Sequence, residues 1–161
     1  MLIPFKNMPK NARVWIYQAN RELNSEESTF AIQESESFCE QWAAHGHELN
    51  CSCQLTHNRF LVLAVDESID LPSGCSIDSS VHLMRHLEKN LGIDFFDRTN
   101  ITFLRDGNVF MEPLTNLKSK IKKGTITRET LIFNNLVPTI GALESSWTVP
   151  AQNTWLKKYF S

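Results

Sequence analysis

The order of apolar and polar positions along the chain predicts strands that alternate with helices. Residues 13–23 begin with a β-branched and aromatic run that is typical of a strand. Residues 49–56 alternate between Leu or Cys and polar side chains, so we expect a half-buried strand at a sheet edge. Residues 60–65 are apolar on both faces and indicate a central strand, which a tight turn at His57-Asn58 joins to the preceding one.

Two amphipathic helices are expected beside these strands. Asn24, followed by acidic residues, is typical of a helix start, and the apolar arc within 27–45 predicts a helix that ends at Gly46. A second helix is expected over 77–91, ending at Gly92. Its core stripe is predicted to be Ile77, Val81, Met84, Leu87 and Leu91.

The last third of the chain carries one strong local signal. Asp106-Gly107 between two short apolar runs predicts a hairpin. A basic helix is expected over 113–123, with its lysines on a solvated face. Residues 122–161 are rich in aromatic residues and interrupted by proline, and we expect them to pack irregularly against the core.

The order β-α-β-β-α-β indicates an α+β fold of the ferredoxin-like type. We therefore expect a single domain with a sheet of about five strands, an extra strand and an aromatic C-terminal segment. Residues 1–12 form a loose lead-in, and residues 13–161 form the single α/β domain. Because both helices would cover one face of the sheet, the C-terminal segment or a second copy of the chain is expected to cover the other.

Composition and charge restrict the classes of partner. The chain has 161 residues, of which 42% are hydrophobic and 21% are charged, with a net charge of −2. This balance gives no long-range attraction to nucleic acid or to anionic membranes, so neither is expected as a partner. No apolar run approaches the length of a signal peptide or a membrane span, which favours a cytoplasmic protein. Free thiols are expected at the four cysteines, Cys39, Cys51, Cys53 and Cys75.

The strongest candidate site is the polar stretch that leads into the second helix. Backbone N–H groups at a helix start attract negative charge, and a glycine there lets a ligand approach closely. The sequence therefore predicts a site for a small anionic ligand or another small ligand. Its expected residues are Ser73, Gly74, Cys75, Ser76, Asp78 and Ser79, with Arg59 or Arg98 as possible counter-charges.

Two alternatives stay open for the same stretch. The thiol of Cys75 at a helix start could be a nucleophile or a redox sensor, with His82 as its base. Asp78 opposes that role, because a nearby carboxylate disfavours a thiolate. The structural alternative is that Ser76, as the N-cap, and Asp78 cap the helix and that Cys75 is a small buried residue beside the turn.

Other groups of polar residues are weaker candidates. Asp78, His82 and His86 share one helix face, which is expected to meet water rather than a metal ion. Asp66-Glu67, after the central strand, is typical of an exposed loop. His45, His47, Cys51, Cys53 and His57 lack the spacing of a zinc site. We expect no metal and no cofactor, because no phosphate-binding loop or dinucleotide fingerprint is present.

Several stretches together resemble a group of short proteins from Bacteroidetes-type bacteria. The matching segments are VWIYQANREL, QWAAHGHEL, NRFLVLAVDE, SGCSIDSSV, DFFDR and FNNLV. Members of the group often carry the label "ABC transporter ATPase", but this chain lacks the phosphate-binding loop that such an activity requires. The resemblance implies a single compact domain in the bacterial cytosol, and no activity or site residues.

Taken together, the sequence favours a binding or accessory domain without enzymatic activity that associates with itself. A thiol-dependent enzyme or redox sensor using Cys75 is one alternative. A structural module for protein–protein interaction is the other.

Overall fold

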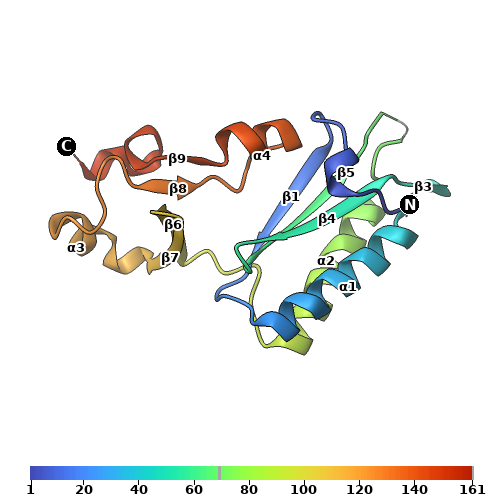
Figure 1. Ribbon diagram of the computed structural model, residues 1–161, viewed down its shortest axis with the longest axis horizontal. Coiled ribbons are helices and arrows are strands. Elements are labelled where there is room, and N and C mark those ends of the chain that lie inside the picture. The colour runs from blue at the N-terminus through green and yellow to red at the C-terminus, as the bar shows by residue number, and fades with distance from the viewer. Residues whose placement is uncertain (69, 161) are drawn as a thin grey trace. The chain divides into compact units, whose positions relative to one another are not determined.

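The computed structural model describes residues 1–68 and 70–160, and within them it has four α-helices and three small sheets. The mixed α+β class is therefore confirmed. The chain divides into two compact units (Figure 1). Unit 1 comprises Met1–Phe96 and Leu136–Glu144, and unit 2 comprises Asp97–Asn135 and Ser145–Ser161. The expectation of one domain over residues 13–161 stays a prediction.

Unit 1 is built on a three-stranded antiparallel sheet. Its strands, in spatial order, are β1 (Arg13–Gln18), β5 (Phe60–Val65) and β4 (Cys51–Thr56). All six residues of β5 are fully buried, because the strand has a hydrogen-bonded neighbour on each side and apolar side chains on both faces. The predicted central strand and the predicted edge strand are thus confirmed. The turn at His57-Asn58 is confirmed too, with positive φ at both residues.

Helices α1 (Ser25–Gln41) and α2 (Gly74–Leu91) lie side by side on one face of this sheet (Figure 1). The start of α1 is confirmed, because the Asn24 side chain accepts a hydrogen bond from Glu27 N at 2.8 Å. Glu27 Oε1 in turn accepts one from Asn24 N at 3.0 Å, which completes a capping box.

The predicted end of α1 at Gly46 is wrong. The helix ends at Gln41, and residues 43–48 form a small hairpin of β2 (Ala43–Ala44) and β3 (His47–Glu48). Its turn uses positive φ at His45 and Gly46. The predicted helix extended over the first hairpin residues because the alanines at 43 and 44 are also good helix formers.

The predicted end of α2 is confirmed, because Gly92 adopts a left-handed conformation with φ 64°. Only two of the five residues in its predicted core stripe are buried. Met84 and Leu87 are buried, but Ile77, Val81 and Leu91 are partly exposed. The buried face instead includes small residues, because α2 also packs closely against β2. The buried residues are Ser76, Ser80, Leu83, Met84 and Leu87.

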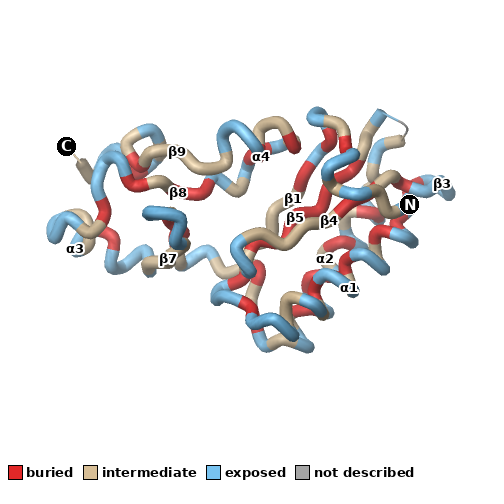
Figure 2. Tube along the Cα trace, in the orientation of Figure 1, coloured by how far each residue is buried: buried red, intermediate tan, exposed pale blue. Residues whose placement is uncertain are grey.

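The main core of unit 1 lies between this sheet and the two helices. One face of β5 contributes Leu61, Leu63 and Val65, and α2 contributes Met84 and Leu87. Figure 2 shows buried positions that continue along β5 and alternate with exposed positions on both helices. This alternation is the amphipathic pattern from which the helices were predicted.

Both ends of the unit 1 sequence are tied to the sheet. In the lead-in that was expected to be loose, Met8 and Ala12 are buried, and Leu2 forms a parallel bridge with Cys51. Helix α4 (Ile140–Ser146) begins where Ile140 N donates a hydrogen bond to Ala12 O at 3.1 Å. The lead-in also contains a 3-10 turn, η1 (Phe5–Asn7).

Unit 2 is built on a four-stranded antiparallel sheet. The strands, in spatial order, are β7 (Asn108–Pro113), β6 (Asn100–Arg105), β8 (Leu131–Phe133) and β9 (Thr148–Pro150). The predicted hairpin is confirmed, because Asp106 and Gly107 form the turn between β6 and β7 with φ values of 50° and 78°. The helical elements are η2 (Leu114–Asn116), α3 (Leu117–Lys122), η3 (Ala151–Asn153) and η4 (Trp155–Tyr159).

The structure does not have the single five-stranded sheet that was expected. The first three long strands keep the spatial order first-third-second, as the ferredoxin-like pattern requires. The next strand, β6, instead pairs with β7 and β8 in the sheet of unit 2. Local patterns identified β6 as a strand, but its pairing depends on contacts with residues far away in the sequence.

Candidate functional site

The predicted site lies at the start of α2, which begins three residues earlier than the sequence suggested. Ser73 is the N-cap, and its hydroxyl accepts a hydrogen bond from Ser76 N at 3.1 Å. The prediction that Ser76 is the cap is therefore wrong. Serines occur at both 73 and 76, so the local sequence offered two equivalent starting points.

The hydroxyl of Ser76 forms a tertiary hydrogen bond instead of capping the helix. Its side chain is buried and donates a hydrogen bond to Ala43 O at 2.7 Å, which ties the first turn of α2 to β2. Its oxygen also lies 2.8 Å from that of Ser73. These two serines therefore support the helix start and are not presented to a ligand.

The remaining polar residues of the prediction face an open groove of about 800 Å³ between α1 and α2. Cys75, Asp78 and Ser79 line it, and all three are exposed. Ser73, Gly74 and Ser76 do not line it. The α2 side of the groove is formed by Cys75, Asp78, Ser79, His82, Leu83 and His86. The other side is formed by Glu34, Ser37, Phe38, Gln41, Trp42 and Ala43.

Sequence reasoning missed the α1 side of this groove. Residues 34, 37, 38 and 41 follow the helical spacing i, i+3, i+4 and i+7, so they form one stripe along α1. The same spacing joins residues 75, 78, 79 and 82 on α2. The periodicity could have identified each stripe separately. Only the packing of α1 against α2 makes them face each other.

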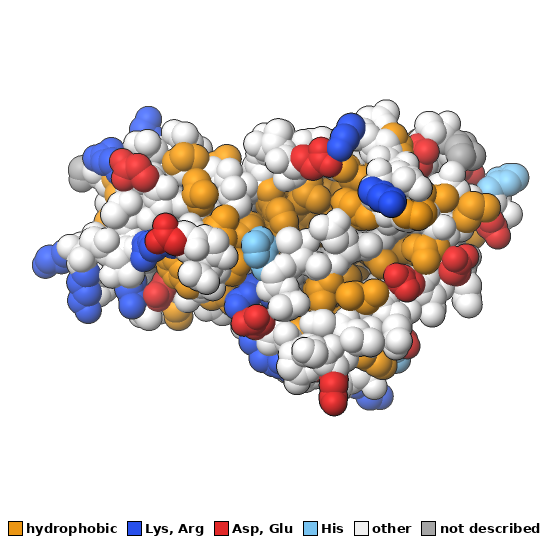
Figure 3. Space-filling view, in the orientation of Figure 1, with side chains coloured by type: hydrophobic (Ala, Val, Ile, Leu, Met, Phe, Trp, Pro, Cys, Tyr) orange, Lys and Arg blue, Asp and Glu red, His pale blue; other side chains and the backbone are white. Residues whose placement is uncertain are grey.

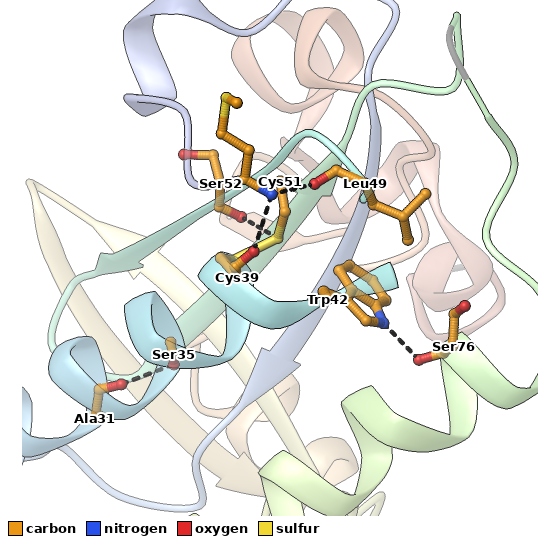
Figure 4. The surroundings of a disulfide bond; sticks show 9 residues. Ala31, Ser35, Cys39, Trp42, Leu49, Cys51, Ser52 and Ser76 are labelled. Carbon is orange, nitrogen blue, oxygen red and sulfur yellow. Dashed lines mark hydrogen bonds between the residues drawn. A yellow bond between two sulfur atoms is a disulfide. The ribbon is translucent and has the colours of Figure 1, made fainter. Parts of the chain in front are cut away.

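Trp42 forms the apolar end of the groove and is held firmly. Its Nε1 donates a hydrogen bond to Ser76 O at 2.8 Å, and Figure 4 shows the indole directed toward the first turn of α2. Its ring centroid lies 4.9 Å from that of Phe38 and 6.0 Å from that of Trp15. Trp42 itself is buried, so it helps to fix Phe38, which is partly exposed, in the wall.

The charged groups of the groove are mainly acidic. Glu34 Oε2 lies 2.9 Å from His86 Nε2, and this contact joins the two helices. Asp78 is the fifth residue of α2, and His82 lies one helical turn further along. Among the residues described as lining the groove there is no Lys or Arg. The carboxylates therefore make an anion a poor fit in this groove, and a neutral or cationic ligand a better one.

Neither arginine that was considered as a counter-charge lines the groove. Arg59 directly precedes β5, whereas α2 follows the other end of that strand. A strand of this length spans roughly 20 Å, so Arg59 lies far from the start of α2. Arg98 belongs to unit 2.

The cysteines differ from the expectation of four free thiols. Cys39 and Cys51 form a disulfide with a Cα–Cα distance of 5.4 Å, and both are fully buried. Figure 4 shows that it links the last turn of α1 to the start of β4. The free-thiol prediction failed for this pair because packing of α1 on β4 brings the two residues together.

The two remaining cysteines have contrasting surroundings. Cys53 is half-buried, and burial, together with the nearby charge of Glu36, raises the pKa of its thiol to about 12. Cys75 is exposed at the groove and is therefore the accessible thiol of the two. The structural alternative of a buried Cys75 is wrong.

The other polar clusters of the sequence do not assemble into a site. In the part of the chain that is described, no three His, Cys, Asp or Glu residues lie close enough together to hold a metal ion. Asp66 accepts a hydrogen bond from Ser68 N, and Glu67 lies 3.6 Å from Arg13. Within residues 1–68 and 70–160, no helix is both long and apolar enough to cross a membrane.

Comparison with known proteins leaves the groove as the main guide to function. No family model, no curated protein and no solved structure matches the chain. The resemblance to the Bacteroidetes-type group stays a prediction.

Proposed function

We propose that the chain is a binding module without enzymatic activity, and that its ligand is a small organic molecule held in the α1–α2 groove. The observation that supports this most directly is the composition of the groove. One side chain, Phe38, offers an aromatic face braced by Trp42, while Asp78 and Glu34 offer carboxylates. A ligand with a flat apolar part and a cationic amine is complementary to both.

This proposal refines the ligand expected from the sequence. A small anionic ligand at the start of α2 remains the alternative, but the carboxylates of the groove disfavour its binding. Asp78 is exposed, so its contribution to binding is modest, about 0.2–1 kcal/mol for a surface ion pair. The aromatic surface is expected to supply most of the affinity.

A matched pair of probes tests the charge preference. Tryptamine and indole-3-propionate share a ring and differ in the sign of their charge. We expect tryptamine to raise the Tm in a concentration-dependent manner and indole-3-propionate to leave it unchanged. Stabilisation by the carboxylate alone would support the anionic alternative, and no effect of either probe would contradict the proposed ligand class.

Two substitutions locate the binding. Asp78→Asn removes the charge and is expected to weaken tryptamine binding by up to about 5-fold, consistent with an exposed ion pair. Asp106→Asn, in the exposed hairpin turn of unit 2, is the matched control and should change nothing. Equal effects of both would mean that the amine binds outside the groove.

A thiol-dependent role for Cys75 is the second candidate, because this residue is exposed in the groove beside Asp78 and His82. Its test is the rate of alkylation with iodoacetamide across pH. Cys53 is the internal control, since its raised pKa keeps it a thiol near neutral pH. Rapid labelling of Cys75 with an apparent pKa well below 8.5 would favour thiol chemistry over simple binding.

We also propose that the protein is cytoplasmic, that it associates with itself, that the unit 1 sheet is ferredoxin-like and that the chain belongs to the Bacteroidetes-type group. The strand order β1-β5-β4 supports the ferredoxin-like sheet. Sedimentation at several protein concentrations tests self-association.

A further inference from the structure

The two units carry opposite net charge, which the balance of the whole chain conceals. Unit 1 has seven Lys and Arg residues and 14 Asp and Glu residues, a net charge of −7. Unit 2 has nine Lys and Arg residues and four Asp and Glu residues, a net charge of +5. The exclusion of nucleic acid rested on the net charge of −2 for the whole chain, so it does not apply to unit 2 alone.

Unit 2 also has a cavity of about 490 Å³ with an unusual lining. It combines an indole with three cationic side chains and contains no carboxylate among the residues described as lining it. Trp155 is 51% exposed, which is uncommon for so large an apolar side chain. The lining residues are Arg128, Thr154, Trp155, Lys157 and Lys158.

Trp155 is exposed but firmly positioned. The next residue, Leu156, is fully buried in the core of unit 2. The hydroxyl of Thr154 accepts a hydrogen bond from Leu156 N at 3.1 Å, which caps the 3-10 turn η4. The rings of Trp155 and Tyr159 also form a T-shaped contact at a centroid distance of 6.3 Å. The indole is therefore exposed to solvent on a fixed support.

The cation opposite this turn is fixed as well. Arg128 donates a hydrogen bond to Phe160 O, and its guanidinium carbon lies 5.8 Å from the centre of the Phe160 ring. Arg128 remains exposed at the cavity. It thus offers N–H donors beside the indole without first having to be ordered.

The positive charge extends beyond the cavity. Helix α3 contributes Lys118 and Lys122, and Lys123 follows it; all three are exposed. Figure 3 shows blue side chains gathered over the part of unit 2 that holds α3 and the C-terminal residues. A small anion would be held by the cavity alone and would not require this wider basic surface.

We propose that unit 2 binds single-stranded nucleic acid, with one base stacked on Trp155 and adjacent phosphates on Arg128, Lys157 and Lys158. An exposed aromatic ring among cations is the combination that single strands recognise, because every base offers a π-face and every linkage carries a charge. A duplex hides its base faces and could use only the cations. An anionic membrane is less suitable, because Trp155 is the only large apolar side chain among the residues described as lining the cavity. This proposal does not depend on the ligand of the α1–α2 groove.

Fluorescence anisotropy of labelled oligonucleotides of about 12 nucleotides tests this proposal on the full chain. We expect oligo-uridylate and oligo-deoxythymidylate to bind more tightly than a duplex of the same length. Three neutralised phosphates predict a slope of about −2 for log K against log salt concentration. A single mononucleotide is expected to bind much more weakly than the oligonucleotides, because it cannot use the wider basic surface.

Substitutions separate stacking from charge. Trp155→Ala is expected to weaken binding by about 5- to 150-fold, the range for loss of one stacked base, and Trp155→Phe should retain most of the affinity. Lys157→Gln should weaken binding and reduce the salt slope by about 0.7. Lys89→Gln, at an exposed lysine of unit 1, is the matched control and should have no effect. Circular dichroism of each variant confirms that the chain remains folded.

Three outcomes would overturn the proposal. The first is no binding at low salt. The second is an affinity for Trp155→Ala equal to that of the unsubstituted chain, which would indicate attraction to any polyanion. The third is equal or tighter binding of the mononucleotide, or of vesicles rich in phosphatidylserine, which would assign the cavity to a free anion or a membrane surface.

Discussion

The candidate binding surfaces of unit 1 and unit 2 differ in charge and in the secondary structure that forms them. Unit 1 presents an acidic groove between two helices of 17 and 18 residues, whereas unit 2 presents a basic cavity beside a five-residue 3-10 turn. Their net charges of −7 and +5 nearly cancel. The difference shows that a near-neutral chain can carry two surfaces of opposite charge, so the net charge of a chain excludes classes of partner only when its charges are evenly mixed.

The units also differ in how they are stabilised. All four cysteines, including the disulfide Cys39–Cys51, belong to unit 1. The core of unit 2 relies on apolar packing around Phe103, which is fully buried and stacked on Phe110 at a centroid distance of 5.2 Å. Changes in redox state are therefore expected to act on one unit and not on the other.

Matched core truncations give the largest expected effects. Leu87→Ala in unit 1 is expected to cost about 2–5 kcal/mol, and Phe103→Ala in unit 2 about 3–5 kcal/mol, because both side chains are fully buried. Urea unfolding followed by tryptophan fluorescence measures each. Trp15 and Trp42 report on unit 1, and Trp147 and Trp155 report on unit 2 once the other pair is replaced by Phe.

These unfolding measurements show whether the two units are stabilised independently of each other. If the units unfold separately, each truncation lowers the midpoint only of its own reporters. If both truncations shift both sets of reporters equally, the chain unfolds as one cooperative unit, which would support the single-domain expectation.

Reduction of the disulfide is expected to have the next largest effect. A dithiol reductant, or the double substitution Cys39→Ala/Cys51→Ala, should destabilise unit 1 by about 2–4 kcal/mol, because the unfolded chain regains conformational freedom. The reporters of unit 2 should remain unchanged. Cys75→Ala is the control, since its side chain is exposed and unpaired with another cysteine.

The redox state of Cys39 and Cys51 in the cell also tests the expected cellular location. Mass spectrometry of the chain isolated under alkylating conditions shows whether Cys39 and Cys51 are joined. Two free thiols would agree with the cytoplasmic expectation, whereas a disulfide would favour an oxidising compartment. A disulfide whose reduction left the Tm unchanged would contradict the predicted effect on unit 1.

The smallest expected effect is at the N-terminus of α1. Hydrogen bonds from the Arg21 side chain and the Asn24 backbone lower the pKa of Glu27 from 4.5 to about 2. Because the folded state favours the ionised carboxylate, this contribution is fully present above pH 4.5 and is lost as the pH falls toward 2. Glu27→Gln should therefore lower the Tm at neutral pH and reduce its loss upon acidification.

Glu26→Gln is the matched control for Glu27, because Glu26 is an exposed neighbour in the same first turn. We expect the profile of Tm against pH for this variant to follow that of the unsubstituted chain. Identical profiles for the Glu26 and Glu27 variants would show that the negative charge of Glu27 makes no measurable contribution, because a glutamine at this position can still accept the hydrogen bond from Asn24 N.

Much of the local structure was determined by the sequence itself. The helix start at Asn24, the end of α2 at Gly92 and the turn at Asp106-Gly107 depend on neighbouring residues only, and all three are confirmed. The central position of β5 could also be predicted from its sequence, because a strand without a polar face must be covered on both sides.

Tertiary structure alone decided how these elements combine. It moved β6 into a second sheet, joined Cys39 to Cys51, and turned the stripe of Phe38 toward that of Cys75 to form the groove. The physical reason is the same in each case: such contacts join residues far apart in the chain, and their stability depends on packing that no local pattern encodes.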